Sequence, residues 1–367
     1  MTPTISVILP VYNTGPYIDK CIRSILEQTF GDLEVIAIDD CGQDQAMAIV
    51  ERHAAADQRV RIIRNGKNHG VAYSRNAGIL AARGKYLSFI DSDDSIDLDF
   101  YQKLYFEAME HPADVVKADF LIDHGDHVEY SEMHANIHEA VRKKKFVGIY
   151  YTHILPCSLI RRDLVVQHRI EFPPLTHGED IVFLVKVLLN MKRFSLVDDT
   201  YYRYYNRAGS ASKQISGRYI DSLIKHYELI ASIIEESNLC ESERIEFWHH
   251  AILNPLFYHH IKLAASRPDK LKLYSYFFDG IRKLLYDNPI FLKIRIKHPN
   301  PFYDKIYHQC SDIDAIDNNI LESIIAPPAK RVIFQSLGLT AASIRIKNNK
   351  YKLRVLGVPF VSIKWNS

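Results

Sequence analysis

The sequence predicts an α/β protein. Its first half should form a mostly parallel sheet flanked by helices, followed by a mainly helical C-terminal region that ends in a β-hairpin. Short apolar runs alternate with stretches of helical periodicity through the first half, which is typical of parallel strands joined by crossover helices. Helical periodicity rich in Tyr, His and Leu follows from residue 218. The final residues change to a period of two, as strands do.

The elements of the first half follow in order along the chain. Apolar runs of strand length lie at residues 5–9, 35–38, 60–63 and 86–90. Pro10 ends the first run, and Pro16 suits the first turn of a helix, where its missing N–H is not needed. That helix has one apolar face, made of Ile18, Cys21, Ile22, Ile25 and Leu26. Further helices are expected at residues 46–56, 71–82 and 98–109.

The remaining chain is less regular. Residues 115–172 have a mixed pattern, after which we expect a helix at 181–189, a strand at 194–197 and a polar loop at 206–217. Alternating apolar and basic residues on both sides of Asn348-Asn349 predict the final hairpin. We therefore expect three units, which are an α/β domain at 1–215, a helical domain at 216–340 and a basic hairpin tail at 341–367.

Length and charge limit the functional classes. The chain has 367 residues, of which 47% are hydrophobic, enough for a large core in more than one domain. Its formal net charge of +2 creates no overall field toward nucleic acid, so we expect no nucleic-acid partner. No leader pattern and no apolar run of membrane-spanning length is visible. We expect a cytoplasmic protein, with peripheral contact to the inner face of the cytoplasmic membrane as an option.

Acidic residues follow the expected strands at the edge where a parallel sheet binds its ligands. Asp39 and Asp40 follow the second strand, and residues 91–94, Asp-Ser-Asp-Asp, follow the fourth. Glu179 and Asp180 open a later helix. Clustered carboxylates repel one another unless a cation or donors compensate them, and their oxygens suit Mg²⁺ or Mn²⁺. The alternative is that these residues only end strands and cap helices.

Five motifs in this order resemble the family 2 glycosyltransferases, which have the GT-A fold, a Rossmann-like sheet flanked by helices. The resemblance spans residues 5 to about 210 and is nearest to bacterial enzymes that build capsule, lipopolysaccharide and other surface glycans. The motifs are Ser6-Val7-Ile8-Leu9-Pro10-Val11-Tyr12-Asn13, Ile38-Asp39-Asp40, Asn68-His69-Gly70-Val71-Ala72-Tyr73-Ser74-Arg75-Asn76-Ala77-Gly78, Phe89-Ile90-Asp91-Ser92-Asp93-Asp94 and Gly178-Glu179-Asp180.

The resemblance implies a donor site for a UDP-sugar at the N-terminal motifs. Pro10, Val11 and Tyr12 would lie under the uracil and ribose. Arg75 would reach the uracil or the diphosphate with its planar donors, and Asn68 belongs to the same donor set. The alternatives are a proline that ends a strand, a core tyrosine and an arginine that faces solvent.

Asp39 would accept the uracil N3–H, which helps to select uracil over cytosine. Asp40 could share this task, and the sequence does not divide the two roles. The family's usual Gly-Ser after this pair is Cys41-Gly42 here. The sequence therefore does not assign the contacts of this loop.

The resemblance also assigns the acidic motif to the metal and the donor. Asp93 would bind Mn²⁺ or Mg²⁺, with Asp91 on the ribose or on the metal through water. Ser92 belongs to the donor set, and Asp94 would hold the hydroxyls of the donor sugar or a metal-bound water. The cation would offset charge that builds on the UDP leaving group.

Asp180 is the expected general base for the acceptor hydroxyl, so that a single in-line displacement inverts the anomeric carbon. Glu179 and His177 would orient the acceptor, a glycan or a lipid-linked glycan. The alternative for the Glu-Asp pair is favourable charge placement at a helix N-terminus. Three further candidates for phosphate contact, or for a lid over the site, are Arg203, Arg207 and Ser210.

The leading hypothesis is therefore an inverting, metal-dependent transferase of a hexose or N-acetylhexosamine. A non-catalytic sugar- or protein-binding relative remains an alternative. A sugar nucleotidyltransferase is another, although such enzymes use a glycine-rich loop where this chain has Pro10-Val11-Tyr12-Asn13. The basic tail could contact anionic lipid or be the charged edge of a small sheet, and the aromatic helical region could form a homodimer.

Overall fold

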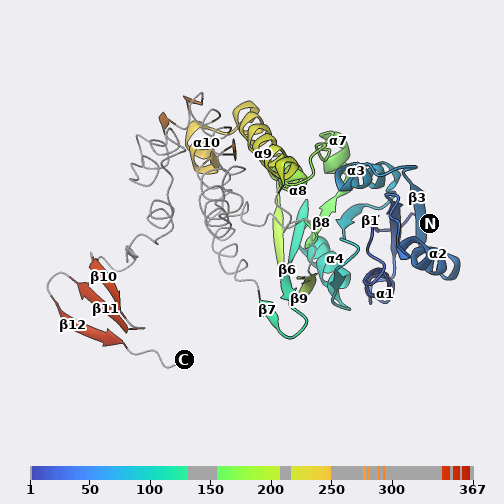
Figure 1. The fold of residues 1–367 in the computed structure, drawn as a ribbon, viewed down its shortest axis with the longest axis horizontal. Coiled ribbons are helices and arrows are strands. Elements are labelled where there is room, and N and C mark those ends of the chain that lie inside the picture. The colour runs from blue at the N-terminus through green and yellow to red at the C-terminus, as the bar shows by residue number, and fades with distance from the viewer. Residues whose placement is uncertain are drawn as a thin grey trace.

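The computed structural model describes residues 2–130, 155–206 and 216–248, together with single residues between 276 and 293 and the backbone of three strands after residue 340. Its main feature is a mixed, mostly parallel sheet of nine strands (Figure 1). The sheet order is β3-β2-β1-β4-β8-β6-β9-β5, and β7 pairs with β6. The α/β class predicted from the sequence is confirmed.

The sheet strands are β1 (Ile5–Val11), β2 (Leu33–Asp39), β3 (Val60–Arg64), β4 (Tyr86–Phe89), β5 (Ser95–Ile96), β6 (Val115–Asp123), β7 (Val128–Tyr130), β8 (Ser158–Arg161) and β9 (Phe194–Tyr205). The helices are α1 (Ile18–Leu26), α2 (Ala46–Ala56), α3 (Val71–Ala81), α4 (Phe100–Glu110), α7 (Arg162–Gln167), α8 (Glu179–Asn190), α9 (Gly217–Glu236) and α10 (Glu241–Trp248). The predicted helix at 46–56 has the observed bounds of α2, and the other predicted helices differ by a few residues at their ends.

Two apolar cores lie on the two faces of the sheet, because successive strand side chains point to opposite faces. Val7 and Leu9 of β1 belong to the core formed with α1, α2 and α4. Ile8 belongs to the opposite core, formed with α3, α7 and α8. A β-carbon on Gly78 of α3 would lie 2.5 Å from Ile8 Cγ2, so glycine is needed there for α3 to pack closely on β1.

The strand order places the ligand edge of the sheet. β1, β2, β3 and β4 are mutually parallel, so their C-terminal ends share one edge. The chain passes from β1 outward through β2 to β3 and then returns to the other side of β1 as β4. This reversal is a topological switch point, where open α/β sheets bind their ligands. The loops after β1, β2 and β4 therefore lie together there.

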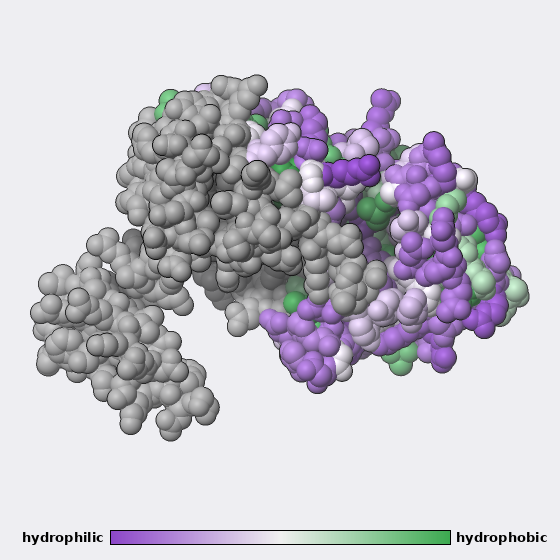
Figure 2. Space-filling model, viewed as in Figure 1, coloured by the Kyte–Doolittle hydropathy of each residue, from purple (hydrophilic) through white to green (hydrophobic). Residues whose placement is uncertain are grey.

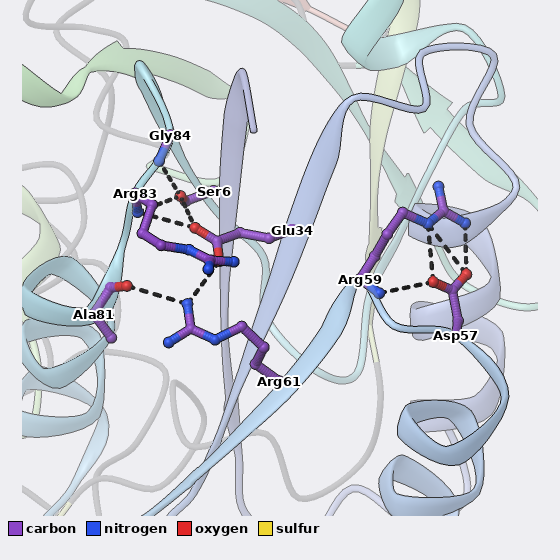
Figure 3. Close-up of polar contacts among 8 residues, drawn as sticks. All are labelled: Ser6, Glu34, Asp57, Arg59, Arg61, Ala81, Arg83 and Gly84. Carbon is purple, nitrogen blue, oxygen red and sulfur yellow. Dashed lines mark hydrogen bonds and ion pairs between the residues drawn. The ribbon is translucent and has the colours of Figure 1, made fainter. Parts of the chain in front are cut away.

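At the opposite edge of the sheet, near the start of β2, a buried carboxylate links several elements by hydrogen bonds (Figure 3). Glu34 is 2% exposed and accepts hydrogen bonds from Ser6 Oγ at 2.8 Å and Arg61 Nη1 at 2.7 Å. It also accepts bonds from the backbone N–H of Arg83 at 2.9 Å and from the Arg83 guanidinium at 2.8 Å. These contacts join β1, β2, β3 and the segment before β4 at the edge away from the acidic loops.

Two regions differ from the predictions. The strand expected at 194–197 continues to Tyr205 as β9, which pairs with β6 and, antiparallel, with β5. Residues within 115–172, for which no element was predicted, form β6, β7, β8 and α7. The polar loop expected at 206–217 falls largely on residues 207–215, which lie outside the described residues.

The C-terminal hairpin is present and has a third strand. β10 (Ala341–Lys347) and β11 (Lys350–Val355) pair antiparallel with Lys347 opposite Lys350, as a two-residue connection requires. β12 (Val358–Ile363) adds to β11. The division into units at 215 and 340 stays a prediction.

The surface of the described N-terminal part is mainly hydrophilic on the face drawn in Figure 2, where apolar side chains appear in small, separate areas. In the part of the chain that the structure describes, no helix combines the length and the apolar character needed to cross a membrane.

Candidate active site

The adjacent carboxylates at the end of β2, Asp39 and Asp40, have different surroundings. Asp40 is 3% exposed, and its Oδ1 accepts bonds from Asn65 Nδ2 at 2.8 Å and from the His69 N–H at 2.9 Å. Its Oδ2 accepts from the Gly70 N–H at 2.9 Å. Asp40 therefore holds the segment that leads into α3, the helix that carries Arg75.

Asp39 is less enclosed. Its Oδ1 accepts a bond from the Cys41 N–H at 2.8 Å, and its Oδ2 lies 3.9 Å from Arg64 Nε. Among the described residues, Oδ2 has no hydrogen-bond donor. Cys41 has a positive φ of 59°, a conformation that favours glycine or asparagine, so the Cys41-Gly42 departure from the family sequence falls on a tight turn.

The loop after β1 lies against the loop after β2. Asn13 Oδ1 accepts from the Gln43 N–H at 2.8 Å, and a β-carbon on Gly42 would come within 2.8 Å of the Asn13 backbone nitrogen. At the end of β1, Pro10 is half-buried and Val11 is buried. Tyr12 is 48% exposed, which leaves its ring accessible for packing on a ligand.

Arg75 links two of the predicted acidic motifs. It is 4% exposed, and its Nη2 donates to Asp91 Oδ1 at 2.8 Å while Nη1 donates to Glu179 Oε1 at 2.8 Å. The guanidinium lies 5.4 Å from the centre of the Phe172 ring. Burial alone would lower the pKa of Arg75, but Asp91 and Glu179 raise it above its ordinary value. The arginine therefore stays charged and compensates the carboxylates.

The acidic loop after β4 is tied to β9 and to the loop after β1. Asp94 is 2% exposed and accepts from the Tyr202 hydroxyl and, at 2.8 Å, from the Tyr205 N–H. Ser92 Oγ accepts from Thr14 Oγ1 at 3.0 Å. Asp91 has a side chain that is 37% exposed. The expected contact of Asp94 with the donor sugar stays a prediction.

The Glu179–Asp180 pair begins α8, directly after Gly178 in the left-handed conformation. Asp180 Oδ1 accepts from the Ile181 N–H at 2.9 Å. Burial raises the pKa of Glu179 to about 7, with the Asp180 charge adding to the rise and Arg75 opposing it. Burial also raises the pKa of Asp180 above its usual range. A carboxylate with a raised pKa is a stronger base, as proton abstraction requires.

The other predicted residues are more dispersed. Arg203 Nε donates to Asp97 Oδ1 at 2.7 Å, and Asn68 is exposed. His177 packs edge-on against Tyr219 with ring centres 4.5 Å apart. Arg207 and Ser210 lie outside the described residues, so their suggested phosphate contacts stay predictions.

Comparison with known proteins identifies the family. The sequence profile of glycosyl transferase family 2 matches residues 6–168. A glycosyltransferase of Haemophilus influenzae is 30% identical over 197 residues, which cover 52% of this chain and 74% of that protein. The chain belongs to glycosyl transferase family 2.

A second curated relative and a solved structure are also similar to this chain. The Bacillus subtilis glycosyltransferase EpsJ is 29% identical over 226 residues, which cover 58% of this chain and 64% of EpsJ. Among solved structures, S. aureus TarS 1-349 in complex with UDP-GlcNAc is similar, with a TM-score of 0.63 and 22% identity, covering 98% of this chain and 99% of that one. This likeness concerns the fold, and it confirms the predicted GT-A class.

Sequence reasoning missed several residues that contact the family 2 motifs, hold the turn before one of them or interact electrostatically with one. Tyr202 binds the acidic loop from 108 positions away, and Ser222 of α9 binds the turn before Glu179. Lys117 of β6 is 3% exposed, and burial lowers its pKa to about 8 while Cys157 and Asp180 raise it. A lysine in an apolar strand was a usable signal, whereas the tyrosine and the serine carried none.

The carboxylates after β4 are compatible with the metal that family 2 implies. Within the described ranges, no three His, Cys, Asp or Glu side chains are arranged to hold an ion by themselves. Mg²⁺ and similar ions commonly use only one or two protein carboxylates and complete their shell with substrate phosphates and water. Asp91 and Asp93 are both partly exposed, and their hard oxygens suit such an open site.

Proposed function

We propose that this chain is a metal-dependent, inverting glycosyltransferase. It would move a hexose or N-acetylhexosamine from a UDP-sugar to a hydroxyl of a glycan or lipid-linked glycan in bacterial surface-glycan synthesis. The observation that carries the proposal is the double contact of Arg75 with Asp91 and Glu179, each at 2.8 Å. The loop expected to bind the donor and the pair expected to hold the base are therefore both hydrogen-bonded to the Arg75 side chain.

The nucleoside end of the donor is assigned to the edge formed by β1 and β2. Asp39 would accept the uracil N3–H, because its Oδ2 has no hydrogen-bond donor in the described part of the chain. Asp40 is already engaged by three donors, so it would support the loop rather than contact the uracil. Tyr12 is exposed beside them. UDP-GlcNAc, with which TarS 1-349 was solved in complex, is a donor of the proposed class.

Asp93 and Asp91 would hold Mn²⁺ or Mg²⁺ together with the diphosphate of the donor. The ion would supply Lewis-acid stabilisation of charge on the departing phosphate. Arg75 orients Asp91 by a charge-assisted hydrogen bond. Asp94, held by β9, fixes the backbone of the same loop.

Asp180 would act as the general base. It would take the proton of the acceptor hydroxyl while that oxygen attacks the anomeric carbon, and the bond from this carbon to the β-phosphate oxygen would break on the opposite face. UDP leaves with the bonding electrons, and the configuration is inverted in one displacement. Glu179, fixed by Arg75, would orient the acceptor and keep the proton affinity of Asp180 high.

The proposal is tested by a donor screen. UDP-glucose, UDP-galactose, UDP-GlcNAc and UDP-GalNAc are compared for Mn²⁺-dependent thermal stabilisation and for UDP release with and without glycan acceptors. We expect Asp93→Ala to abolish the Mn²⁺-dependent part of donor binding. Asp180→Asn should keep donor binding and lose transfer by at least about 100-fold. Asp163→Asn, at the opposite edge of the sheet near Arg161, serves as the matched control.

The same screen separates the alternatives. A non-catalytic relative would bind UDP or sugar without releasing UDP from any donor. A sugar nucleotidyltransferase would bind a nucleoside triphosphate and release pyrophosphate. Full transfer by Asp180→Asn would disprove the assignment of the base.

A further inference from the structure

The turn that precedes the Glu179–Asp180 pair is held by a helix from beyond the catalytic motifs. Ser222 of α9 is 6% exposed, and its Oγ accepts bonds from the N–H groups of Thr176 at 3.1 Å and His177 at 3.0 Å. The same hydroxyl donates to the carbonyl oxygen of His177 at 2.9 Å. A serine hydroxyl has one donor and two acceptor sites, so this turn uses all of them.

Two further contacts come from the same face of α9. His177 packs edge-on against Tyr219, with ring centres 4.5 Å apart. A β-carbon on Gly178, which has a φ of +80°, would lie 2.4 Å from Nδ1 of His226. Tyr219, Ser222 and His226 are spaced by three and four residues, so they lie on one side of the helix. The turn at 176–178 is therefore enclosed by α9, which lies beside α8 in Figure 1.

The position of this turn decides the position of the carboxylates that follow it. Glu179 is the first residue of α8, and its Oε1 reaches Arg75 at 2.8 Å. A shift of the turn would move Glu179 and Asp180 together relative to the acidic loop. A displacement of about 1 Å in a reacting group can cost about 100-fold in rate. The donor loops, in contrast, follow β1, β2 and β4, and the hydrogen bonds described above join them to one another, to α3 and to β9.

We propose that Ser222 is a positioning residue for the catalytic carboxylates. Helix α9 then belongs to the transfer machinery and is not part of an independent accessory domain. This inference rests on the proposed role of Asp180 as the base. It predicts that loss of the Ser222 hydroxyl impairs the transfer step and leaves donor binding intact.

The test compares Ser222→Ala with Ser232→Ala in the full-length protein. Ser232 lies on the same helix, and its Oγ donates to Glu236 in an exposed pair at 2.8 Å, so its loss should leave activity unchanged. The number of folded sites is measured by UDP titration with Mn²⁺, and turnover per site is measured with whichever UDP-sugar of the screen releases UDP fastest. For Ser222→Ala we expect full binding stoichiometry and a UDP dissociation constant within about twofold of the wild-type value. We expect kcat to be about 10- to 100-fold lower than that of wild type.

Hydrogen exchange supplies a readout that does not depend on substrate. In Ser222→Ala, the amides of Thr176 and His177 lose their acceptor and should exchange faster, with little change in the α3 amides. If Ser222→Ala folds poorly, Ser222→Cys replaces it, because a thiol is close in size but is a weak donor and acceptor.

The outcomes separate this inference from the proposed function. Unchanged kcat per UDP-binding site in the serine variant, with Asp180→Asn inactive, would overturn the positioning role and leave the transferase proposal intact. A fall in binding stoichiometry that accounts for the whole loss of activity would show that Ser222 only stabilises the fold. Transfer by Asp180→Asn would instead remove the base on which the inference depends.

Discussion

At the scale of single residues, the site depends on how neighbouring carboxylates are partnered. Asp39 and Asp40 are adjacent in the sequence, yet Asp40 accepts three hydrogen bonds from the segment at 65–70 whereas Asp39 accepts one. The sequence predicted that this pair would lie at the donor edge. It could not divide the roles, because the partners of Asp40 are 25 to 30 residues away.

Exchange of each carboxylate for its amide should separate these roles. Asp39→Asn should weaken UDP binding about 10-fold or more, because an acceptor for the uracil N–H is altered, with little loss of stability. Asp40→Asn places N–H donors against backbone N–H groups, so we expect the free energy of unfolding to fall by about 1–3 kcal/mol. Calorimetric UDP titration and urea unfolding measure the two effects. The same loss of UDP affinity in both variants, at equal stability, would contradict this division.

The raised pKa of Glu179 predicts a pH dependence. A carboxylic acid is protonated below its pKa, and the protons of the coupled Glu179–Asp180 pair are lost in steps that belong to the pair, so Asp180 is fully available as a base only above the upper step. The transfer rate should therefore fall as the pH drops below about 7, the pKa of Glu179. In Glu179→Gln a negative charge beside Asp180 is lost and Arg75 is less neutralised, so both changes lower the pKa of Asp180.

The acidic limb of kcat/KM should consequently move to lower pH by roughly one unit in Glu179→Gln. The charged groups that act on this pair are Arg75, Asp91 and Lys117, and none is changed in the variant. Glu51→Gln, which alters an exposed ion pair with Arg64, is the control. An unshifted limb in Glu179→Gln would show that another group controls the profile.

At the scale of elements, helices were predicted more accurately than strands. Helix α2 was predicted from local apolar spacing alone, whereas β9 was expected to end at Val197 and continues to Tyr205. The polar pair Asp198-Asp199 interrupts its apolar pattern, and Asp199 has a positive φ of 58°. Pairing with β6 shifts register at this point and then resumes up to Tyr205. This continuation depends on a distant strand, so the local sequence did not indicate it.

The unpredicted part of β9 carries a bond that we expect to matter for the metal. The Tyr202 hydroxyl donates to Asp94 and accepts from the Asp91 N–H at 3.4 Å. In Tyr202→Phe the acidic loop loses both contacts, so the Mn²⁺-dependent gain in UDP affinity should shrink about 5- to 10-fold. UDP titration with Mn²⁺ and with EDTA measures this gain.

Tyr101→Phe is the matched control for this prediction. Tyr101 is also fully buried, and its hydroxyl donates to Ser88 Oγ at 3.1 Å, so its loss should reduce stability without changing the Mn²⁺ effect. Equal Mn²⁺ responses of the two variants would show that Tyr202 contributes only packing. Removal of the metal should also make wild type and Tyr202→Phe bind UDP alike.

At the scale of the whole molecule, the two edges of the sheet have different tasks. The C-terminal ends of β2 and β4 carry clustered carboxylates, which are costly to hold together and which we propose bind the donor and the metal. The other edge carries Glu34 (Figure 3), where buried charge is matched by donors from several elements. Stability and catalysis should therefore be separable by mutation at the two edges.

Glu34→Gln tests this separation. Burial alone would raise the pKa of Glu34, but hydrogen bonds from Arg83, Ser6 and Arg61 outweigh it and lower that pKa. The stabilisation is thus present above the ordinary pKa of 4.5 and is lost as the pH falls through the lowered folded value. At pH 7 we expect Glu34→Gln to reduce the free energy of unfolding by about 1–3 kcal/mol, and this difference from wild type should shrink as the pH falls below 4.5. Urea unfolding across pH measures it, with Glu27→Gln, which alters an exposed ion pair with Arg23, expected to cost less than about 1 kcal/mol. UDP affinity should stay unchanged in both variants, and a weakened affinity in folded Glu34→Gln would show that the two edges are coupled through the strands.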